Sequence, residues 1–204
     1  MARIGVLGGT FDPIHYGHLA IAEEARYILN LARVYLIPAA HQPLKQGQHV
    51  ASAAHRLAMV QLACDDNPVL IASSIELDRP PPSYTVDTII ALRQQLEPDT
   101  ELYFLLGADA LALLPRWQRI SELLTLTRFA VLTRSGITLD LDGVVQALPA
   151  AAGRISVIAG PALEISSEML RQRMATGLPV RYQLPDPVLT YIYEHKLYGT
   201  SIAD

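Results

Sequence analysis

Residues 8–19 have the types and the order expected of a phosphate-binding loop that leads into a helix. The segment reads GGTFDPIHYGHL, and Gly8 and Gly9 allow the backbone N–H groups to come close to a ligand. The start of the following helix adds about half a positive charge, aimed at the same place. We therefore expect an anion, such as a nucleotide phosphate, to bind here.

Two histidines open this helix. His15 and His18 stand at positions i and i+3, so their side chains share one face of the first turn. Gly17 lies between them and leaves room for a flat base or a ribose against the backbone. Histidines at this spacing can share a zinc ion, but zinc needs a third protein ligand. Cys64, the only cysteine, lies in an apolar helical stretch without a partner at ligand spacing, so a zinc site is disfavoured.

The segment resembles the signature of the nucleotidyltransferase superfamily with the His-x-Gly-His motif, whose members transfer a nucleotidyl group by attack on an α-phosphorus. The form of residues 8–15 is similar to that of the bacterial nicotinate mononucleotide adenylyltransferases, which join ATP to a pyridine mononucleotide in NAD synthesis. The chain has no Gly-x-Gly-x-x-Gly after its first strand and no Gly-Lys-Ser/Thr, so other phosphate loops do not fit. The resemblance implies nucleotide contacts at Gly8, Gly9, Thr10, Phe11 and Gly17, and catalytic roles for His15 and His18.

A second anion site is predicted at residues 165–171, which read ISSEMLR. Ser166 and Ser167 are candidate N-cap hydroxyls, and Arg171 stands four residues after Ser167 on the same helix face. These groups can hold a diphosphate leaving group, although an ordinary capped helix with a solvated arginine has the same pattern. The segment resembles the family's Ile-Ser-Ser-Thr-x-x-Arg element, which binds the ATP phosphates, with Glu168 in place of the threonine. The resemblance makes Arg171 a catalytic residue.

The middle of the chain has residue patterns suited to a second substrate. Residues 83–88 start a helix after a proline run, with Ser83 or Thr85 as the expected cap, and its free N–H groups can receive a carboxylate. Asp109 follows a buried strand, where a carboxylate can accept hydrogen bonds from ribose hydroxyls. Trp117, the only tryptophan, lies in a polar loop, where it either stacks on a pyridine ring or packs half-buried against the protein.

These segments resemble the Ser-Tyr-Thr, Gly-Ala-Asp and loop tryptophan of the nicotinate mononucleotide enzymes, and residues 191–199 match their closing helix. The resemblance implies that the tryptophan loop stacks on the pyridine and that backbone amides near Thr85 receive its carboxylate. The family's Pro-Pro-His-Lys/Arg loop reads Gln-Pro-Leu-Lys here, so Leu44 cannot supply a histidine's donor. The expected substrate contacts are Lys45, Tyr84, Thr85, Gly107, Asp109, Trp117 and Arg134. For Lys45 and Arg134, a solvated surface position is the alternative.

The expected mechanism is direct in-line transfer, in which the 5′-phosphate of nicotinate mononucleotide attacks the α-phosphorus of ATP and pyrophosphate leaves. A phosphate oxygen is already ionised near neutral pH, so no protein nucleophile is needed. His18 is the expected donor to the α-phosphate, and Mg²⁺ would enter with ATP. Nicotinamide mononucleotide or phosphopantetheine as acceptor, and a non-catalytic adenine-nucleotide sensor, are the alternatives.

Composition agrees with a cytosolic enzyme of one domain. The 204 residues are 50% hydrophobic and 18% charged, and no apolar stretch suits a membrane span or a signal peptide. A single cysteine fits a reducing compartment, and a formal net charge of −4 argues against a nucleic-acid surface. Neither nucleic acid nor membrane is an expected partner. The sequence leaves the oligomeric state open, a homo-oligomer included.

Short apolar runs alternate with helical segments, a pattern typical of an α/β fold with a doubly wound, mostly parallel sheet. Such Rossmann-like sheets bind ligands beyond the carboxyl ends of their strands, where the loop after the first strand lies. We also expect a small C-terminal helical part, and surface loops at 79–82 and 135–142. The expected strands are 4–7, 34–38, 69–72, 102–106, 129–133 and 155–158, and the expected helices are 17–29, 53–64, 86–96, 110–114 and 120–126.

Overall fold

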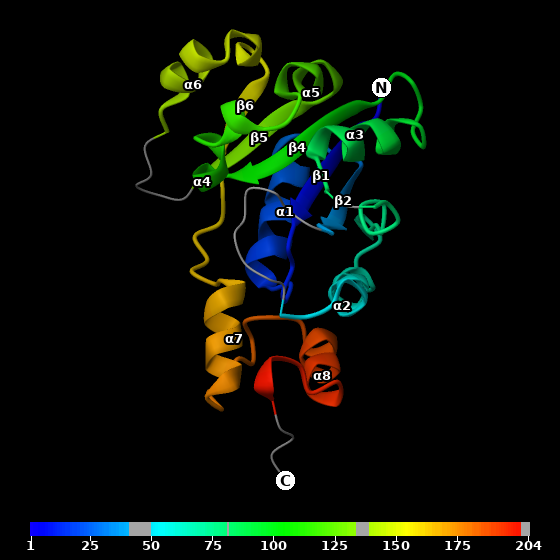
Figure 1. The fold of residues 1–204 in the computed structure, drawn as a ribbon, viewed down its shortest axis with the longest axis vertical. Coiled ribbons are helices and arrows are strands. Elements are labelled where there is room, and N and C mark those ends of the chain that lie inside the picture. Colours follow the sequence, from blue (N-terminus) through cyan, green and yellow to red (C-terminus); the bar gives the residue numbers. More distant parts are fainter. Residues whose placement is uncertain (41–49, 81, 134–138, 201–204) are drawn as a thin grey trace.

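The computed structural model describes residues 1–40, 50–80, 82–133 and 139–200, and within them six strands form one sheet (Figure 1). The strand order is β3-β2-β1-β4-β5-β6, and the pairings between these strands are all parallel. The expected doubly wound α/β fold is therefore confirmed, with its switch point between β1 and β4. The strands are β1 (Arg3–Gly9), β2 (Arg33–Pro38), β3 (Leu70–Ala72), β4 (Glu101–Gly107), β5 (Arg128–Thr133) and β6 (Ile155–Ala159).

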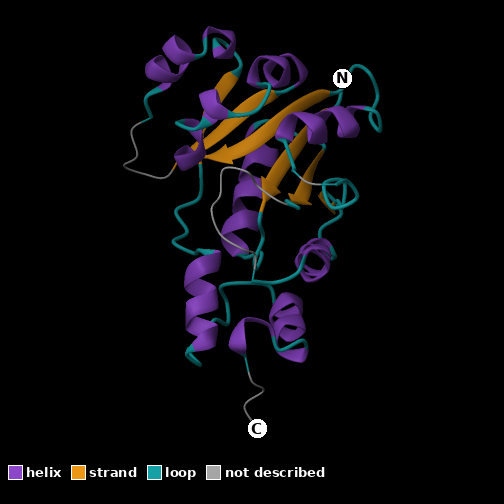
Figure 2. Ribbon diagram, viewed as in Figure 1, coloured by secondary structure: helices purple, strands orange, loops and turns teal. Residues whose placement is uncertain are grey.

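Helices pack against both faces of the sheet (Figure 2). They are α1 (Tyr16–Ile28), α2 (Ala53–Cys64), α3 (Thr85–Arg93), α4 (Ala108–Leu111), α5 (Ile120–Leu126), α6 (Leu141–Ala147), α7 (Ser167–Ala175) and α8 (Asp186–Glu194), with 3-10 helices η1 (Leu114–Arg116), η2 (Pro149–Ala151) and η3 (Leu197–Gly199). In the described part of the chain, no helix is long and apolar enough to cross a membrane.

One surface-loop prediction was partly wrong. Residues 141 and 142, expected in a loop, begin helix α6. Asp140 is the N-cap of this helix, and its Oδ1 accepts a hydrogen bond from the Gly143 N–H at 2.8 Å. Asp at this position satisfies one of the N–H groups that a helix start leaves without an intrahelical partner, which stabilises a short helix that we did not expect.

The alternation of side chains along each strand divides the core into two clusters. In β4, Leu102, Phe104 and Leu106 pack with the apolar sides of α3 and α5, whereas Tyr103 and Leu105 pack with those of α1 and α2 on the other face. Successive side chains of a strand point to opposite faces, so a strand that is apolar throughout is buried on both sides. This explains the continuous apolar runs from which the strands were predicted.

The expected C-terminal helical part is present. Helices α7 and α8 and the 3-10 helix η3 lie beyond the carboxyl ends of β1 and β2, and α2 packs against α8 between them and the sheet (Figure 1). Leu170 of α7 and Ile192 of α8 are buried in the same cluster as α1 and α2. The C-terminal helices therefore complete one core cluster at the edge of the sheet where ligands bind in such folds.

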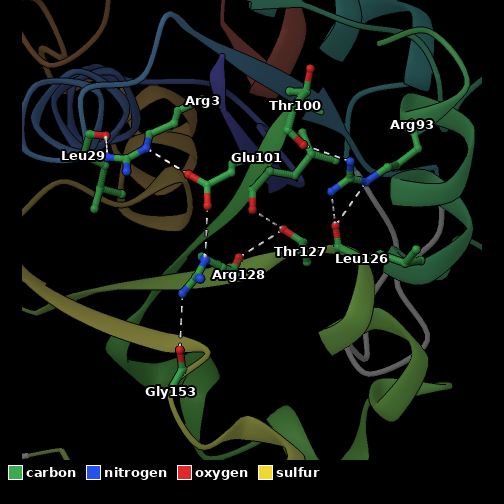
Figure 3. Close-up of polar contacts among 10 residues, drawn as sticks. Arg3, Leu29, Arg93, Thr100, Glu101, Leu126, Thr127, Arg128 and Gly153 are labelled. Atoms are coloured by element: carbon green, nitrogen blue, oxygen red, sulfur yellow. Dashed lines mark hydrogen bonds and ion pairs between the residues drawn. The ribbon is translucent and has the colours of Figure 1, made fainter. Parts of the chain in front are cut away.

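The opposite edge, where the strands begin, is closed by charged side chains (Figure 3). Glu101 at the start of β4 pairs with Arg3 of β1 at 2.9 Å and with Arg128 of β5 at 3.7 Å. Arg93 at the end of α3 donates to the carbonyl oxygens of Thr100 and Leu126. These contacts join neighbouring strands and connections across the amino edge.

Candidate active site

The loop after β1 lies at the switch point of the sheet, where β1 separates β2 from β4. Gly8 and Gly9, expected in the loop, are the last residues of β1 and lie opposite Ile37 and Pro38 of β2. A Cβ atom at Gly9 would lie 2.9 Å from Cε1 of Phe11. Glycine is therefore needed at this position so that the strand can end against a buried phenyl ring, and the loop itself begins at Thr10.

The backbone of this loop has its carbonyl groups held by the protein and its N–H groups left open. No hydrogen bond joins the N–H groups of Thr10, Phe11 or Asp12 to another described residue. The carbonyls of Gly9, at the end of β1, and of three loop residues accept hydrogen bonds: Gly9 from Ala39 N at 2.8 Å, Thr10 from Arg56 Nη1 at 2.8 Å, Asp12 from Arg171 Nη1 at 2.7 Å and Pro13 from Ser167 Oγ at 2.8 Å. Successive N–H groups of this kind are suited to an anion, and the anion site expected from the sequence stays a prediction.

His15 and His18 share one face of the first turn of α1, as expected. Their rings stack with centroids 3.7 Å apart, and the His15 backbone N–H donates to Nδ1 of His18 at 3.3 Å. A neutral His18 ring that accepts at Nδ1 carries its proton on Nε2, which makes Nε2 a hydrogen-bond donor. A Cβ atom at Gly17 would lie 3.0 Å from the His15 ring, so this glycine makes room for the imidazole.

The second predicted anion element lies against the first. Ser166 is the N-cap of α7, as expected, and its Oγ accepts from the Met169 N–H at 3.2 Å. The next two side chains of the motif, Ser167 and Arg171, donate to the carbonyls of Pro13 and Asp12. Segments more than 150 residues apart in the sequence thus meet at one loop. A guanidinium that uses Nη1 for this contact still has donors at Nε and Nη2 to offer.

The buried side chain of Asp12 connects the loop to other segments of the protein through hydrogen bonds. Its side chain is 2% exposed and accepts hydrogen bonds from Val50 N at 2.9 Å, Ala51 N at 3.2 Å and the Tyr198 hydroxyl at 2.6 Å. Burial, followed by the contact with Asp12, raises the pKa of Tyr198 far above its usual value, so the phenol stays protonated and donates. The 3-10 helix η3 is therefore fastened to the loop after β1 through a buried carboxylate.

The start of α3 differs from the prediction in its cap. The N-cap is Tyr84, with extended backbone, and neither Ser83 nor Thr85 occupies that position. The Tyr84 carbonyl accepts from the N–H groups of Asp87 and Thr88, so the first helical turn closes without a side-chain cap. Thr85 is the first helical residue, and the N–H groups that begin a helix remain suited to a carboxylate.

A buried carboxyl group supports this helix start from behind. Thr88 Oγ1 donates to Glu76 Oε1 at 2.7 Å, and Arg79 Nη2 donates to Thr88 Oγ1 at 2.7 Å. Burial raises the pKa of Glu76, against the opposing effects of Thr88 and Arg79. The beginning of α3 is thus tied to the connection that follows β3.

Asp109 follows β4 and Trp117 lies in a loop, as the sequence predicted. Of the two alternatives for Trp117, the structure shows packing against the protein. β4 ends at Gly107, and Asp109 is exposed in the first turn of α4. Trp117 follows η1, is partly buried, and contacts Phe104 and Phe129 edge-on at 5.5 and 6.1 Å between ring centroids. Packing against the core is therefore part of its role, and stacking on a pyridine stays a prediction. Lys45 and Arg134 lie outside the described residues, as does Leu44.

Comparison with known proteins identifies the family to which this site belongs. The family model described as cytidylyltransferase-like matches residues 6–173. A protein of Roseiflexus sp. (strain RS-1), named "Probable nicotinate-nucleotide adenylyltransferase", is 57% identical over 198 residues, covering 97% of this chain and 98% of the relative. The chain belongs to the nicotinate-nucleotide adenylyltransferase family. A protein of Geobacillus thermodenitrificans (strain NG80-2) with the same name is 40% identical. The alignment covers 100% of this chain and 90% of that relative.

The fold agrees with that of solved adenylyltransferases. The nicotinic acid mononucleotide adenylyltransferase of Plasmodium falciparum, solved in complex with NaAD, superimposes with a TM-score of 0.79 at 18% identity, and each chain is covered completely. A second structure of that enzyme, complexed with APC, gives a TM-score of 0.77. At this level of identity the likeness concerns the arrangement of strands and helices.

Three buried residues of this adenylyltransferase-family site were not predicted from the sequence. Asp12 lies inside the first motif, but its type did not reveal that it accepts three hydrogen bonds from two other segments. Arg56 is an arginine within the apolar helix α2, a signal that we did not use, and Tyr198 was noted only as part of the closing helix. Arg56 and Tyr198 reach the loop from distant segments, which the spacing of residues in a single sequence does not reveal.

Proposed function

We propose that this protein transfers the adenylyl group of ATP to nicotinate mononucleotide, which gives nicotinate adenine dinucleotide and pyrophosphate in NAD biosynthesis. The observation that carries the proposal is the meeting of the two predicted phosphate elements: Ser167 and Arg171 of α7 donate to carbonyls of the loop that precedes His15 and His18. The names of the relatives support the same reaction and the same acceptor.

The proposed chemistry is a single in-line displacement. A 5′-phosphate oxygen of nicotinate mononucleotide attacks the α-phosphorus of ATP, a new P–O bond forms, and the bond to the bridging α,β-oxygen breaks with its electron pair leaving on pyrophosphate. Because the attacking oxygen is already anionic, the protein mainly positions two anions and stabilises charge on the transferring group. No protein nucleophile takes part.

Each group of the site has a role in this displacement. We assign Nε2 of His18 as the donor to an α-phosphate oxygen, because Nδ1 already accepts from the His15 N–H. The open N–H groups of residues 10–12 hold the triphosphate, with His15 beside them. Arg171 and Ser167 lie at the loop end that would receive the leaving pyrophosphate, and Arg171 keeps two nitrogens for it.

We propose that Mg²⁺ enters with ATP, where it would supply positive charge to the phosphates of the substrate. The described residues hold no cluster of three His, Cys, Asp or Glu side chains at metal-ligand distances. Asp12, the buried carboxylate next to the loop, already accepts three hydrogen bonds from the protein. The protein's own contribution is therefore assigned to hydrogen-bond donors rather than to carboxylate ligands.

The acceptor is assigned to the side of the site formed by α3, α4 and the Trp117 loop. We propose that the N–H groups at Thr85, beside Tyr84, receive the pyridine carboxylate, that Asp109 and Gly107 contact a ribose, and that Trp117 offers a ring edge or face to the pyridine. Lys45 and Arg134 stay proposed phosphate contacts.

The test is pyrophosphate release from Mg-ATP with three acceptors in parallel: nicotinate mononucleotide, nicotinamide mononucleotide and phosphopantetheine. The proposal requires a strong preference for the nicotinate acceptor. Preference for either other acceptor would keep the chemistry and change the substrate. Binding of ATP without release from any of the three would contradict the enzyme assignment and favour a nucleotide sensor.

A further inference from the structure

Arg56 of α2 is a fully buried arginine directly behind the phosphate loop. Its relative exposure is 0%, and Nη1 donates to the Thr10 carbonyl at 2.8 Å across 46 residues of sequence. Its Nε and Nη2 atoms are also buried, and neither has a hydrogen-bond acceptor among the described residues. A buried guanidinium with so few partners is costly, so its one hydrogen bond to a described residue needs an explanation.

The charge on Arg56 is retained in spite of its burial. Burial lowers the pKa of this guanidinium, while the nearby Asp12 carboxylate acts in the opposite direction. An arginine side chain remains protonated at neutral pH even after such a shift. A positive charge therefore lies under the loop, and it is directed at the carbonyl oxygen of Thr10.

The contact of Arg56 with the Thr10 carbonyl also sets the direction of the Phe11 N–H, because both groups belong to one planar peptide unit. The peptide between Thr10 and Phe11 is trans, and in a trans peptide the C=O and the N–H point in opposite directions. By holding the Thr10 carbonyl toward α2, Arg56 directs the Phe11 N–H away from α2. This is one of the N–H groups without an acceptor among the described residues.

The same peptide is held in a conformation that a non-glycine residue does not favour. Phe11 has a φ of 50°, in the left-handed region. A flip of the Thr10–Phe11 peptide would return this φ to the negative range and would turn the Phe11 N–H inward. Such outliers persist only where the surroundings over-determine them, and the bond from Arg56 is the contact that opposes the flip.

We propose that Arg56 is a positioning residue, which fixes the Thr10–Phe11 peptide so that the Phe11 N–H faces the triphosphate of the nucleotide. The role rests on the proposed function in one respect, that the ligand of the loop is ATP. Arg56 itself does not contact the substrate. It acts through the loop backbone, whose Asp12 and Pro13 carbonyls are held in addition by Arg171 and Ser167.

A purely structural arginine is available for comparison in the same chain. Arg93 also donates to backbone carbonyls, with Nε and Nη2 on Leu126 and Nη1 on Thr100, but it lies at the amino edge of the sheet. Comparison of three variants therefore separates the loss of a guanidinium from the loss of the Thr10–Phe11 peptide orientation. The variants are Arg56→Met, Arg56→Lys and Arg93→Met. The lysine variant keeps the charge and one donor but not the planar fork.

The decisive measurement observes the peptide itself. The chain has three phenylalanines, and residue 11 is the one that follows a threonine, so protein labelled with ¹³C-carbonyl threonine and ¹⁵N-phenylalanine reports the Thr10–Phe11 peptide selectively. We expect the Phe11 amide proton to shift downfield when Mg²⁺ and adenosine α,β-methylene triphosphate are added to the unmodified protein and to Arg93→Met. In Arg56→Met this shift is lost, and in Arg56→Lys it is reduced.

Binding of the same analogue by calorimetry gives the second readout. Arg56→Met is expected to raise its dissociation constant about ten- to a hundredfold, the worth of one hydrogen bond to a charged group, and Arg56→Lys less. Arg93→Met is expected to change it less than about twofold while it lowers the melting temperature. If Arg56→Met does not fold, the lysine variant decides by the same two readouts.

The inference is overturned if the Phe11 amide of the unmodified protein does not respond to the analogue, or if folded Arg56 variants respond and bind like the unmodified protein. It is also overturned if Arg93→Met weakens binding as much as the Arg56 variants do. Absence of turnover with nicotinate mononucleotide, together with a normal Phe11 response, would contradict the proposed function and leave the role of Arg56 intact.

Discussion

The two edges of the sheet use arginine in opposite ways. At the amino edge, Arg93 makes hydrogen bonds with all three nitrogens, and its acceptors are the carbonyls of Thr100 and Leu126 (Figure 3). At the carboxyl edge, Arg56 and Arg171 each make one hydrogen bond to a described residue, to the carbonyls of Thr10 and Asp12. Every nitrogen of Arg93 makes a hydrogen bond within the protein, whereas Nε and Nη2 of Arg171 make none to a described residue and are able to bind an anion.

The backbone shows the same contrast. At the amino edge, Arg93 donates to the carbonyls of Thr100 and Leu126. At the carboxyl edge, the N–H groups of residues 10–12 have no acceptor among the described residues. An unpaired N–H group costs free energy unless a ligand or water takes the hydrogen bond. In the proposed function, ATP takes these hydrogen bonds at the carboxyl edge, whereas at the amino edge the protein supplies both partners.

The largest effect that we expect is a loss of kcat from a substitution at the carboxyl edge. His18→Ala removes the proposed Nε2 donor to the α-phosphate and is expected to lower kcat by about two to three orders of magnitude, the usual effect of losing one preorganised transition-state donor. The measurement is steady-state pyrophosphate release, with thermal unfolding as the check on folding. Near-normal turnover in a folded variant would remove His18 from the mechanism.

The converse test is at the amino edge. Arg93→Met leaves the carbonyls of Leu126 and Thr100 without their charged donor, so we expect the free energy of unfolding to fall by about 3 kcal/mol. The kcat and KM values at 25 °C should stay unchanged, since the residue lies far from the loop after β1. Urea denaturation and pyrophosphate release measure the two quantities. A loss of kcat in folded protein would show that the edges are not independent.

Sequence patterns were sufficient for the scaffold because its signals are local. The bounds of α2 and α5 agree with the structure at both ends, and each predicted strand is present. Alternation of apolar runs with helical segments needs no knowledge of distant contacts. The helix that was missed, α6, is short and depends on one aspartate cap in a segment rich in loop-forming residues.

The site was predicted where its residues form a motif and missed where they converge from elsewhere. His15, His18, Ser167 and Arg171 stand in recognisable spacings, and the structure places them around one loop. The partners that hold the loop from behind, Arg56 and Tyr198, come from helices 46 and about 190 residues further along the chain. Their positions follow from packing of α2 and η3, which a single sequence does not specify.

A smaller effect is expected from the C-terminal anchor of the carboxyl edge. Tyr198→Phe removes the hydroxyl that donates to Asp12 at 2.6 Å and leaves the ring packing in place. We expect a loss of about 2 kcal/mol in unfolding free energy, together with a higher KM for ATP, because a charged acceptor under the loop loses one of three donors.

Tyr103→Phe is the matched control for that anchor. Tyr103 is buried in the same core cluster, and its hydroxyl has no hydrogen bond to another described residue. Its substitution should change the unfolding free energy by less than about 0.5 kcal/mol and leave the KM for ATP unchanged. Equal effects of the two variants would mean that Tyr198 acts through packing and not through Asp12.

The smallest expected effect concerns the buried carboxyl group behind the acceptor side. Burial raises the pKa of Glu76 in the folded protein, so the folded state binds this proton more tightly than the unfolded chain does. The stability from this group is complete at acid pH and is lost as pH rises from its ordinary value of 4.5 through the folded-state pKa. Unmodified protein should therefore lose stability relative to Glu76→Gln across this range.

Urea unfolding of both proteins between pH 4 and pH 8 measures this loss, and Glu122→Gln gives a control of opposite sign. Glu122 is exposed on α5, and its hydrogen bond to Arg119 lowers its pKa, so its contribution appears as pH rises. A parallel pH dependence in the two variants would assign the effect to the net charge of the protein. Opposite slopes would assign it to the burial of Glu76 behind the start of α3.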